Sequence, residues 1–275
     1  MSNLQGLGTG LSKAALLFEP YERQARLYPA FLCILPLVVM AITLYGNQLL
    51  DMKGIFALAG GAGLMYLLAD IVRSKGKEKE KALWQEWGGA PSIQILRHRD
   101  GVLDSVSKGR YHEILASKIK VKFPTKEAEA ADPAAADAVY AAAGNWLREA
   151  TRDKKRFDLL FRANVTYGYR RNGFGVRWLG LLISLGVVGW VVVRLGFSSW
   201  EQRLSAAATP EALLGAGEVA SLGAALLMAL IWVFYFSKSR VHEAAYSYAC
   251  RLILACEALP LRVTTKAAKR ETASK

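Results

Sequence analysis

The sequence predicts an all-α membrane protein with four transmembrane helices, arranged two plus two, and a mainly helical domain inserted between the pairs. The prediction rests on four apolar segments: Ala30–Leu50, Ile55–Val72, Val176–Leu195 and Leu213–Phe236. A helix of about 20 residues crosses the hydrocarbon core of a bilayer, and it satisfies its own backbone hydrogen bonds there. Ionisable residues are almost absent from these segments, since Asp70 and Arg194 lie near segment ends, where a charge can reach the interface.

Basic residues are concentrated outside the apolar segments. The chain has a formal net charge of +13, and the stretch from Arg73 to Arg177 holds 22 basic and 13 acidic residues. Residues 237–275 add 8 basic and 3 acidic residues. Lys and Arg close to the ends of spans remain on the cytoplasmic side of a membrane. The distribution therefore predicts that both termini and the central domain are cytoplasmic.

These limits divide the chain into five parts. They are an N-terminal interfacial segment at 1–29, transmembrane helices 1 and 2 at 30–72, a basic cytoplasmic domain at 73–175, transmembrane helices 3 and 4 at 176–236, and a cytoplasmic C-terminal helix and tail at 237–275. Proline interrupts helices because it lacks an N–H group. We therefore expect Pro20 and Pro29 to break the helix of the first part.

The patterns outside the spans predict mostly helix. Helices are expected over 75–87, 111–119, 132–152, 154–169 and 238–259. Gly88-Gly89 is expected to end the first of these, and Asp132-Pro133 is a typical helix start, with Asp as the cap. A short strand is expected around Ile93–Leu96.

No pattern in the soluble part predicts an enzyme. Arg97-His98-Arg99-Asp100 contains the residues of a kinase catalytic loop, but no Gly-rich loop precedes it and no Asp-Phe-Gly follows it. The histidines and cysteines lack metal-ligand spacing. We therefore predict no catalytic residue, no metal and no cofactor. The cysteines are expected to be inert buried thiols: Cys33, Cys250 and Cys256.

Basic side chains between 97 and 171 form the candidate ligand site. The candidate residues are Arg97, Arg99, Arg110, Arg148, Arg152, Lys154, Lys155, Arg170 and Arg171. Guanidinium groups match phosphate with two parallel hydrogen bonds, so these residues suit a nucleotide or an oligonucleotide backbone. A continuous helix would align four cations in one stripe: Arg148, Arg152, Lys155 and Arg162. Nearby rings are candidates for stacking on bases: Tyr111, Tyr167 and Tyr169.

The same charges also fit two simpler roles. Basic residues next to a membrane attract anionic lipid, and they also set topology, which is sufficient for Arg170, Arg171 and Arg177. The group around Arg148 and Arg152 also fits a solvated helix face.

Small residues recur four apart in the apolar segments. Ala57 and Gly61 lie in the second segment, and Gly180 and Ser184 lie in the third. Small residues at this spacing let helices approach closely. The spacing fits packing within one chain and also association of several chains around a pore.

Short phrases along the chain resemble a known family. They are Gly88-Gly89-Ala90-Pro91, Leu96-Arg97-His98-Arg99-Asp100, Arg110-Tyr111-His112, Thr151-Arg152-Asp153 and Tyr167-Gly168-Tyr169-Arg170-Arg171-Asn172. With the two-plus-two layout, these phrases resemble the four-span membrane effectors of bacterial anti-phage signalling systems, such as the Hailong and cyclic-oligonucleotide systems. The resemblance covers about residues 30–240 in layout.

The resemblance implies a function as well as a layout. Such effectors lie in the bacterial inner membrane and assemble as oligomeric pores, often tetramers, whose opening depolarises the cell. Their soluble domain senses a nucleotide or a single-stranded DNA oligomer made by a co-encoded nucleotidyltransferase. The resemblance therefore implies a toxic anti-phage ion channel, and it leaves open whether the ligand opens or closes it.

A second function also fits the same features. The chain would then be a non-conducting, membrane-anchored scaffold that binds nucleic acid or a protein. It would show salt-sensitive binding of oligonucleotides without any change in membrane potential.

Overall fold

The computed structural model describes residues 19–49, 53–196, 205 and 213–259. Within this part every regular element is a helix, so the all-α prediction is confirmed there. Parts of the predicted interfacial segment and C-terminal tail, 1–18 and 260–275, lie outside the described residues. The chain forms two compact units. Unit 1 comprises Met1–Gln85 with Asn164–Ala245, and unit 2 comprises Glu86–Ala163 with Tyr246–Lys275.

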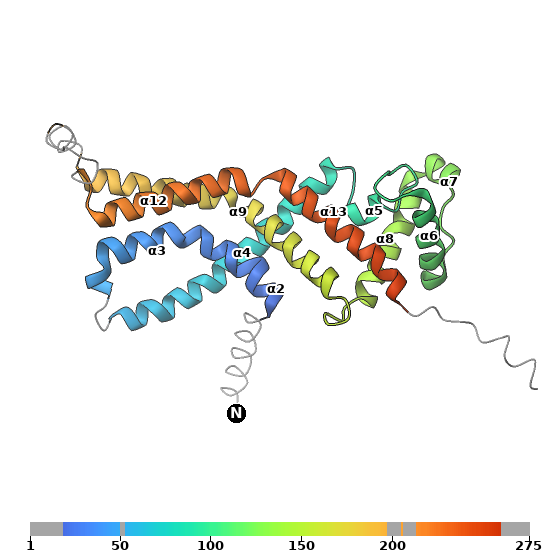
Figure 1. The fold of residues 1–275 in the computed structure, drawn as a ribbon, viewed down its shortest axis with the longest axis horizontal. Coiled ribbons are helices and arrows are strands. Elements are labelled where there is room, and N and C mark those ends of the chain that lie inside the picture. Colours follow the sequence, from blue (N-terminus) through green and yellow to red (C-terminus); the bar gives the residue numbers. More distant parts are fainter. Residues whose placement is uncertain (1–18, 50–52, 197–204, 206–212, 260–275) are drawn as a thin grey trace, which may run out of the picture. The chain divides into compact units, whose positions relative to one another are not determined.

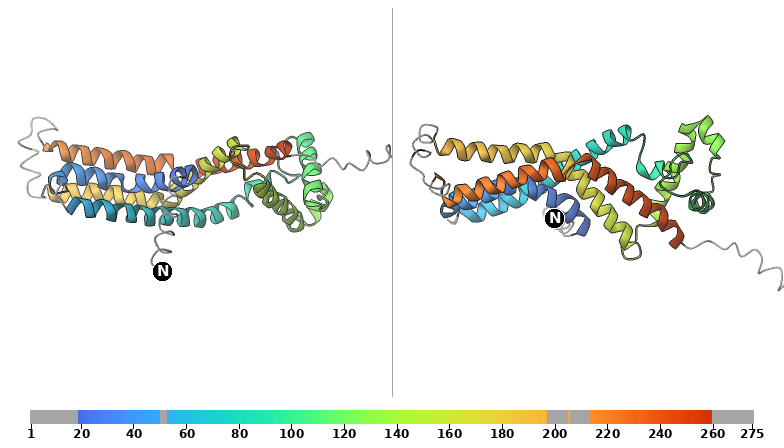
Figure 2. Two further views of the ribbon diagram at one scale, coloured as in Figure 1. Left: turned by 90° about the horizontal axis from the view of Figure 1, so that it is seen from below. Right: turned by 45° about the horizontal axis from the view of Figure 1, so that its top comes forward.

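Unit 1 is a bundle of long helices. It contains α2 (Pro20–Glu22), the π-helical η1 (Arg23–Leu27), α3 (Tyr28–Leu49), most of α4 (Lys53–Glu86), most of α9 (Asp158–Arg194), α12 (Ala216–Leu230) and the π-helical η2 (Ile231–Tyr235). Figures 1 and 2 show α3 and α12 running side by side. Ala30, Val72, Val176 and Trp232 bring side chains of different helices into one buried cluster.

Three of the described helices are long and apolar enough to cross a membrane. They are Pro20–Asn47, Asp158–Arg194 and Ala216–Tyr235. These helices contain the first, third and fourth predicted spans. The second predicted span, 55–72, lies within α4, and the four-span arrangement stays a prediction.

Pro29 does not break the helix, contrary to the prediction, whereas the described helix begins at Pro20. Helical structure is continuous from Pro20 to Leu49, because Pro20 occupies the first turn and the π-helical turn η1 precedes Pro29. Pro29 cannot donate to the carbonyl of Ala25, four residues earlier. The Asn172 side chain of α9 supplies the missing donor, with Nδ2 at 2.7 Å from Ala25 O. A tertiary contact thus compensates for the proline.

Glycines of α9 allow close packing inside unit 1. A Cβ at Gly175 would lie 2.6 Å from the backbone N of Gly76, so the backbones of α9 and α4 touch here. A Cβ at Gly180 would lie 2.1 Å from the Trp232 ring. The small residue at this position is therefore used for packing within one chain. By contrast, a Cβ at Gly186 would meet no described neighbour within 4 Å.

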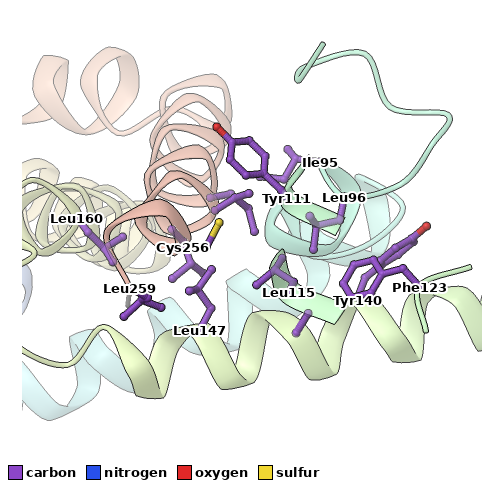
Figure 3. Packing of buried hydrophobic residues seen from close by; sticks show 14 of the residues in the cluster. Ile95, Leu96, Tyr111, Leu115, Phe123, Tyr140, Leu147, Leu160, Cys256 and Leu259 are labelled. Carbon is purple, nitrogen blue, oxygen red and sulfur yellow. The ribbon is translucent and has the colours of Figure 1, made fainter. Parts of the chain in front are cut away.

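Unit 2 is a smaller helical domain. It contains α5 (Pro91–Gln94), α6 (Ser105–Ile119), α7 (Lys126–Ala131), α8 (Pro133–Ala150), the start of α9, the greater part of α13 (Lys238–Leu254) and the 3₁₀ turn η3 (Ala255–Ala258). Figure 3 shows Leu115 of α6, Leu147 of α8 and Cys256 of η3 in the same buried cluster. The C-terminal helix therefore supplies part of this core.

Two predicted boundaries in unit 2 are confirmed. Gly88 and Gly89 follow the end of α4 with φ of +79° and +134°, which suits glycine because it has no Cβ. The Asp132 side chain accepts a hydrogen bond from Ala135 N at 2.9 Å and caps α8, in which Pro133 is the first residue.

Three predicted elements differ in the structure. The strand expected around Ile93–Leu96 is absent, because Pro91 starts the helical turn α5 there. The helix expected over 154–169 begins at Asp158 and continues as α9 to Arg194. The helix expected over 75–87 is the C-terminal part of α4, which ends at Glu86. The helices expected at 75–87 and 154–169 are thus continuous with the apolar segments 55–72 and 176–195.

Candidate ligand-binding surface

Arg97 is buried and holds unit 2 together. Its Nε and Nη2 donate to the two carboxylate oxygens of Asp137 on α8, at 2.8 and 2.6 Å. Nη2 also donates to Gly88 O at 2.8 Å. The hydrogen bond with Asp137 raises the pKa of Arg97, although burial opposes this. The guanidinium edge that would bind a phosphate is therefore already occupied by a carboxylate.

The backbone of residues 96–100 is held by buried donors from α6. Lys108 Nζ donates to the carbonyl oxygens of Arg97 and Asp100, at 2.7 and 2.5 Å. His112 Nε2 lies 2.7 Å from Leu96 O. Burial lowers the pKa of Lys108, and the nearby acids Asp100 and Glu129 partly offset this effect. The segment that resembled a catalytic loop is thus a well-anchored turn.

Glu129 holds the same turn from the other side. Its Oε2 accepts hydrogen bonds from His98 N at 2.8 Å and from the Tyr140 hydroxyl at 2.7 Å. Burial raises the pKa of Glu129, but the hydrogen bonds outweigh it, so the net shift is downward. Arg99 lies nearby with Nε 4.0 Å from Oε1, and half of its side chain is exposed. Arg99 can therefore still reach an anion.

Most of the other candidate cations lie on the surface of unit 2. The exposed ones are Arg99, Arg110, Arg148, Arg152, Lys154 and Lys155. Besides Arg99, several of them have neighbours: Arg110 pairs with Glu257, Arg152 pairs with Glu149, Arg148 donates to Asn145, and Lys154 lies over the Phe161 ring. Exposed pairs of this kind contribute little to stability. A phosphate can therefore displace these partners at low cost.

The cations between 148 and 162 do not form one helical stripe, because the helix is interrupted. α8 ends at Ala150, where Thr151 Oγ1 donates back to Leu147 O at 2.8 Å. The Asp153 carboxylate then accepts from the backbone N–H groups of Lys155 and Arg156, at 2.9 and 3.1 Å. The condition for a single stripe, a continuous helix, is therefore not met, and a polar turn presents these side chains instead.

A pocket beside this turn contains an arginine that the sequence did not single out, Arg251. The pocket has a volume of about 290 Å³ and lies between the first turn of α9 and the end of α13. Arg156 and Arg251 line it, together with apolar side chains such as Phe157 and Leu254. Arg251 is distant in sequence from the basic segment. The amphipathic pattern of 238–259 implied a partner for this helix without saying which one.

Two candidate residues, Arg170 and Arg171, belong to unit 1, and each has different neighbours. Arg171 is buried, with Nη1 at 3.0 Å from Glu80 Oε1 and Nε at 3.1 Å from Asn172 Oδ1. Arg170 instead lies over the ring of Tyr235, with Cζ 4.0 Å from the ring centre. The ligand role of both residues stays a prediction, and Arg171 is fully engaged with neighbours in this structure.

The rings proposed for base stacking are mostly enclosed. Tyr111 and Tyr167 are only 2% and 6% exposed, so neither offers a free face. Tyr169 is half-buried and packs near Tyr235. Phe157 is a core residue. Stacking on these tyrosines therefore receives no support.

The thiols and histidines offer no metal centre in the described part of the chain, where no group of three ligand side chains comes together. Cys33 and Cys256 are buried, and Cys250 is half-buried. Burial raises the pKa of Cys256 to about 11, and Glu257 adds to this shift. Thiols with raised pKa values are poor nucleophiles and poor metal ligands at neutral pH.

The fold and this surface define a class of protein: a chain that is helical throughout its regular described elements, with candidate membrane spans in one unit and an exposed cationic surface on another. Comparisons with protein-family models, with curated proteins and with solved structures find no match to this chain.

Proposed function

We propose that this protein is an oligomeric, ligand-gated ion channel that acts as a toxic anti-phage effector. In this proposal the two pairs of spans cross the bacterial inner membrane, and both termini and the basic domain face the cytoplasm. A nucleotide or DNA oligomer bound to the basic domain controls the pore. The observation that carries the proposal is the combination of charge-poor candidate spans with a cationic surface on a second unit.

The outer surface of unit 1 supports a lipid environment. Large apolar side chains are more than half exposed on helices that are long enough to span a bilayer; examples are Leu182, Leu185, Leu226 and Phe234. In water such a surface is costly, whereas in a bilayer acyl chains cover it.

The small residues that remain open support an oligomer. Gly173, Gly175 and Gly180 are used in packing within the chain, whereas Gly186, Gly189 and Gly223 have open space where a Cβ would stand. Small residues on an open helix face allow a second helix to approach closely. A homo-oligomer, for which we favour a tetramer, would use the open glycines of α9 and α12.

The exposed cations of unit 2 support an anionic ligand. Arg148, Arg152 and the lysines 154 and 155 lie at or after the end of α8, and the pocket with Arg156 and Arg251 lies beside the same turn. Two arginines line this pocket together with apolar side chains and one acidic residue, Asp158. This combination suits a phosphate attached to a base or sugar.

Ion flux through reconstituted protein tests the proposal directly. The purified chain is placed in liposomes loaded with a potassium-sensitive dye, and flux is recorded with and without single-stranded DNA oligomers. We expect flux that a DNA oligomer changes by about tenfold, which corresponds to about 1.4 kcal/mol of coupling. The variant Arg251→Gln should weaken the response, whereas Lys126→Gln, an exposed lysine on α7, should not.

The alternative function gives a different result in the same assay. A scaffold would bind DNA oligomers with normal salt dependence and leave the liposomes tight under every condition. That outcome would remove the channel and retain the binding role.

A further inference from the structure

Two arginines converge on one tyrosine at the end of a candidate span. Arg170 of α9 lies over the Tyr235 ring, with Cζ 4.0 Å from the ring centre, and Arg240 of α13 approaches the same ring at 5.4 Å. All three residues belong to unit 1. Guanidinium groups are attracted to aromatic faces, but two cations near one ring also repel each other. The arrangement therefore favours a nearby anion.

The protein itself provides no such anion among the described residues. Arg170 and Arg240 form no ion pair there, and Nη1 of Arg170 is buried without any hydrogen-bond partner. Acidic groups of unit 1 pair elsewhere, for example Glu22 with Arg26 and Glu80 with Arg171. A buried donor without an acceptor is costly, so the protein alone does not fully satisfy the Arg170 guanidinium.

The position of the cluster indicates what the partner is. Tyr235 is the last residue of the candidate span Ala216–Tyr235. Tyrosine at the end of a span typically lies at the level of the lipid headgroups. Arg240 follows five residues later in the first turn of α13, where backbone N–H groups also favour negative charge. A headgroup phosphate at this level would meet both guanidinium groups.

We infer that Arg170, Tyr235 and Arg240 form a binding site for the phosphate of an anionic phospholipid. The exposed Arg240 and the accessible part of Arg170 donate to the phosphate oxygens, and Tyr235 holds the two guanidinium groups in place. The half-buried ring of Tyr169, 6.4 Å from Tyr235 between centres, packs beside it. The site is separate from the cationic surface of unit 2 and does not depend on the channel function.

The test is the binding of phosphatidylglycerol to the full-length protein in detergent, measured by native mass spectrometry. We expect wild type to retain the lipid, and Arg170→Gln with Arg240→Gln to weaken binding by at least about tenfold, because charge-assisted hydrogen bonds are strong. Phosphatidylcholine should bind more weakly to wild type. The matched control is Arg177→Gln with Arg194→Gln, which loses the same charge from two arginines that also lie over rings.

Three outcomes would overturn the inference. Equal loss of lipid in the control would mean that charge alone matters. Unchanged binding in the test variant would remove the site. Displacement of the lipid by inorganic phosphate or a DNA oligomer would assign the site to a soluble ligand.

A single variant guards against misfolding. Arg240→Gln changes an exposed side chain and should weaken lipid binding while leaving thermal unfolding unchanged. Lipid binding without ion flux would leave this site standing and remove the channel, so the two proposals fail separately.

Discussion

Arg171 of α9 forms an almost fully buried ion pair with Glu80 of α4, with 3.0 Å between Nη1 and Oε1 and side-chain exposures of 9% and 13%. The Tyr167 hydroxyl donates to the same carboxylate at 2.6 Å. The Arg171 guanidinium also contacts Asn172, whose amide donates to Ala25 O. This network joins α9 to α4 and to η1 in unit 1.

We expect Arg171→Met to lower the free energy of unfolding by about 3 kcal/mol, because it leaves the Glu80 carboxylate buried without its cation. Chemical unfolding in detergent, followed by loss of helicity, measures this effect. The control is Lys75→Met, which removes an exposed pair with Glu78 and should change stability little. Equal stability of the two variants would show that the buried pair of Arg171 and Glu80 does not stabilise the fold.

Replacing Gly175 tests the contact between the α9 and α4 backbones. Gly175→Ala places a methyl group 2.6 Å from Gly76 N, and a backbone atom cannot move aside as a side chain can. We expect a loss of about 1–3 kcal/mol in the free energy of unfolding. Gly109→Ala on α6 should instead be neutral or stabilising, because its site is exposed and open and alanine favours helix. A stable Gly175→Ala protein would contradict this packing.

His112 predicts a loss of stability in weak acid. Burial lowers the pKa of His112, although its hydrogen bond with Leu96 O opposes the shift. The unfolded chain therefore binds a proton more readily than the fold does, so the stability of unit 2 falls as the pH drops below about 6.5. At higher pH the His112 ring is neutral in both the folded and the unfolded state, so it contributes no pH dependence to stability.

The variant His112→Gln should flatten that part of the pH profile. Thermal unfolding between pH 7.5 and pH 5.5, about one unit on either side of the unfolded pKa, measures the slope. His242→Gln serves as the control, because this side chain is exposed on α13, and it should keep the wild-type slope. A slope that survives in His112→Gln would assign the acid sensitivity to another group.

The surface at the end of α8 predicts a salt-dependent affinity for single-stranded DNA. Arg148→Gln with Arg152→Gln should weaken binding and lower the slope of log K against log salt by about 1.4, or about 0.7 for each lost phosphate contact. Titration by fluorescence anisotropy at several salt concentrations gives this slope. Lys122→Gln with Lys126→Gln removes the same charge from exposed lysines. This control should keep a steeper slope than the variant at Arg148 and Arg152. Identical slopes for the two variants would mean that the residues 148 and 152 are only solvated surface.

Local chemistry was sufficient to predict several features of the fold. Long apolar runs specify helices wherever the backbone must satisfy its own hydrogen bonds, and three of the four predicted spans lie in helices that meet the requirements of a span. Gly88 and Gly89 end α4 because they adopt positive φ, and Asp132 caps α8 through its own side chain. Each of these features depends on residues that are neighbours in the chain.

The roles of the arginines depended on contacts that sequence separation conceals. Arg97 pairs with Asp137, 40 residues away, and Arg171 pairs with Glu80, 91 residues away. Neither guanidinium is therefore free to bind a ligand in the folded protein. The C-terminal part of α13 packs its apolar face into the core of unit 2. Arg251 therefore lies on the surface of unit 2, beside the pocket.

The amino-acid sequence alone established the helical, apolar character of this protein and its excess of positive charge, because hydrophobic length and net charge are properties of composition and order. Tertiary packing decided which cations remain available to a ligand and how Pro29 is accommodated, because a carboxylate or an amide from a distant helix must first come within hydrogen-bonding distance.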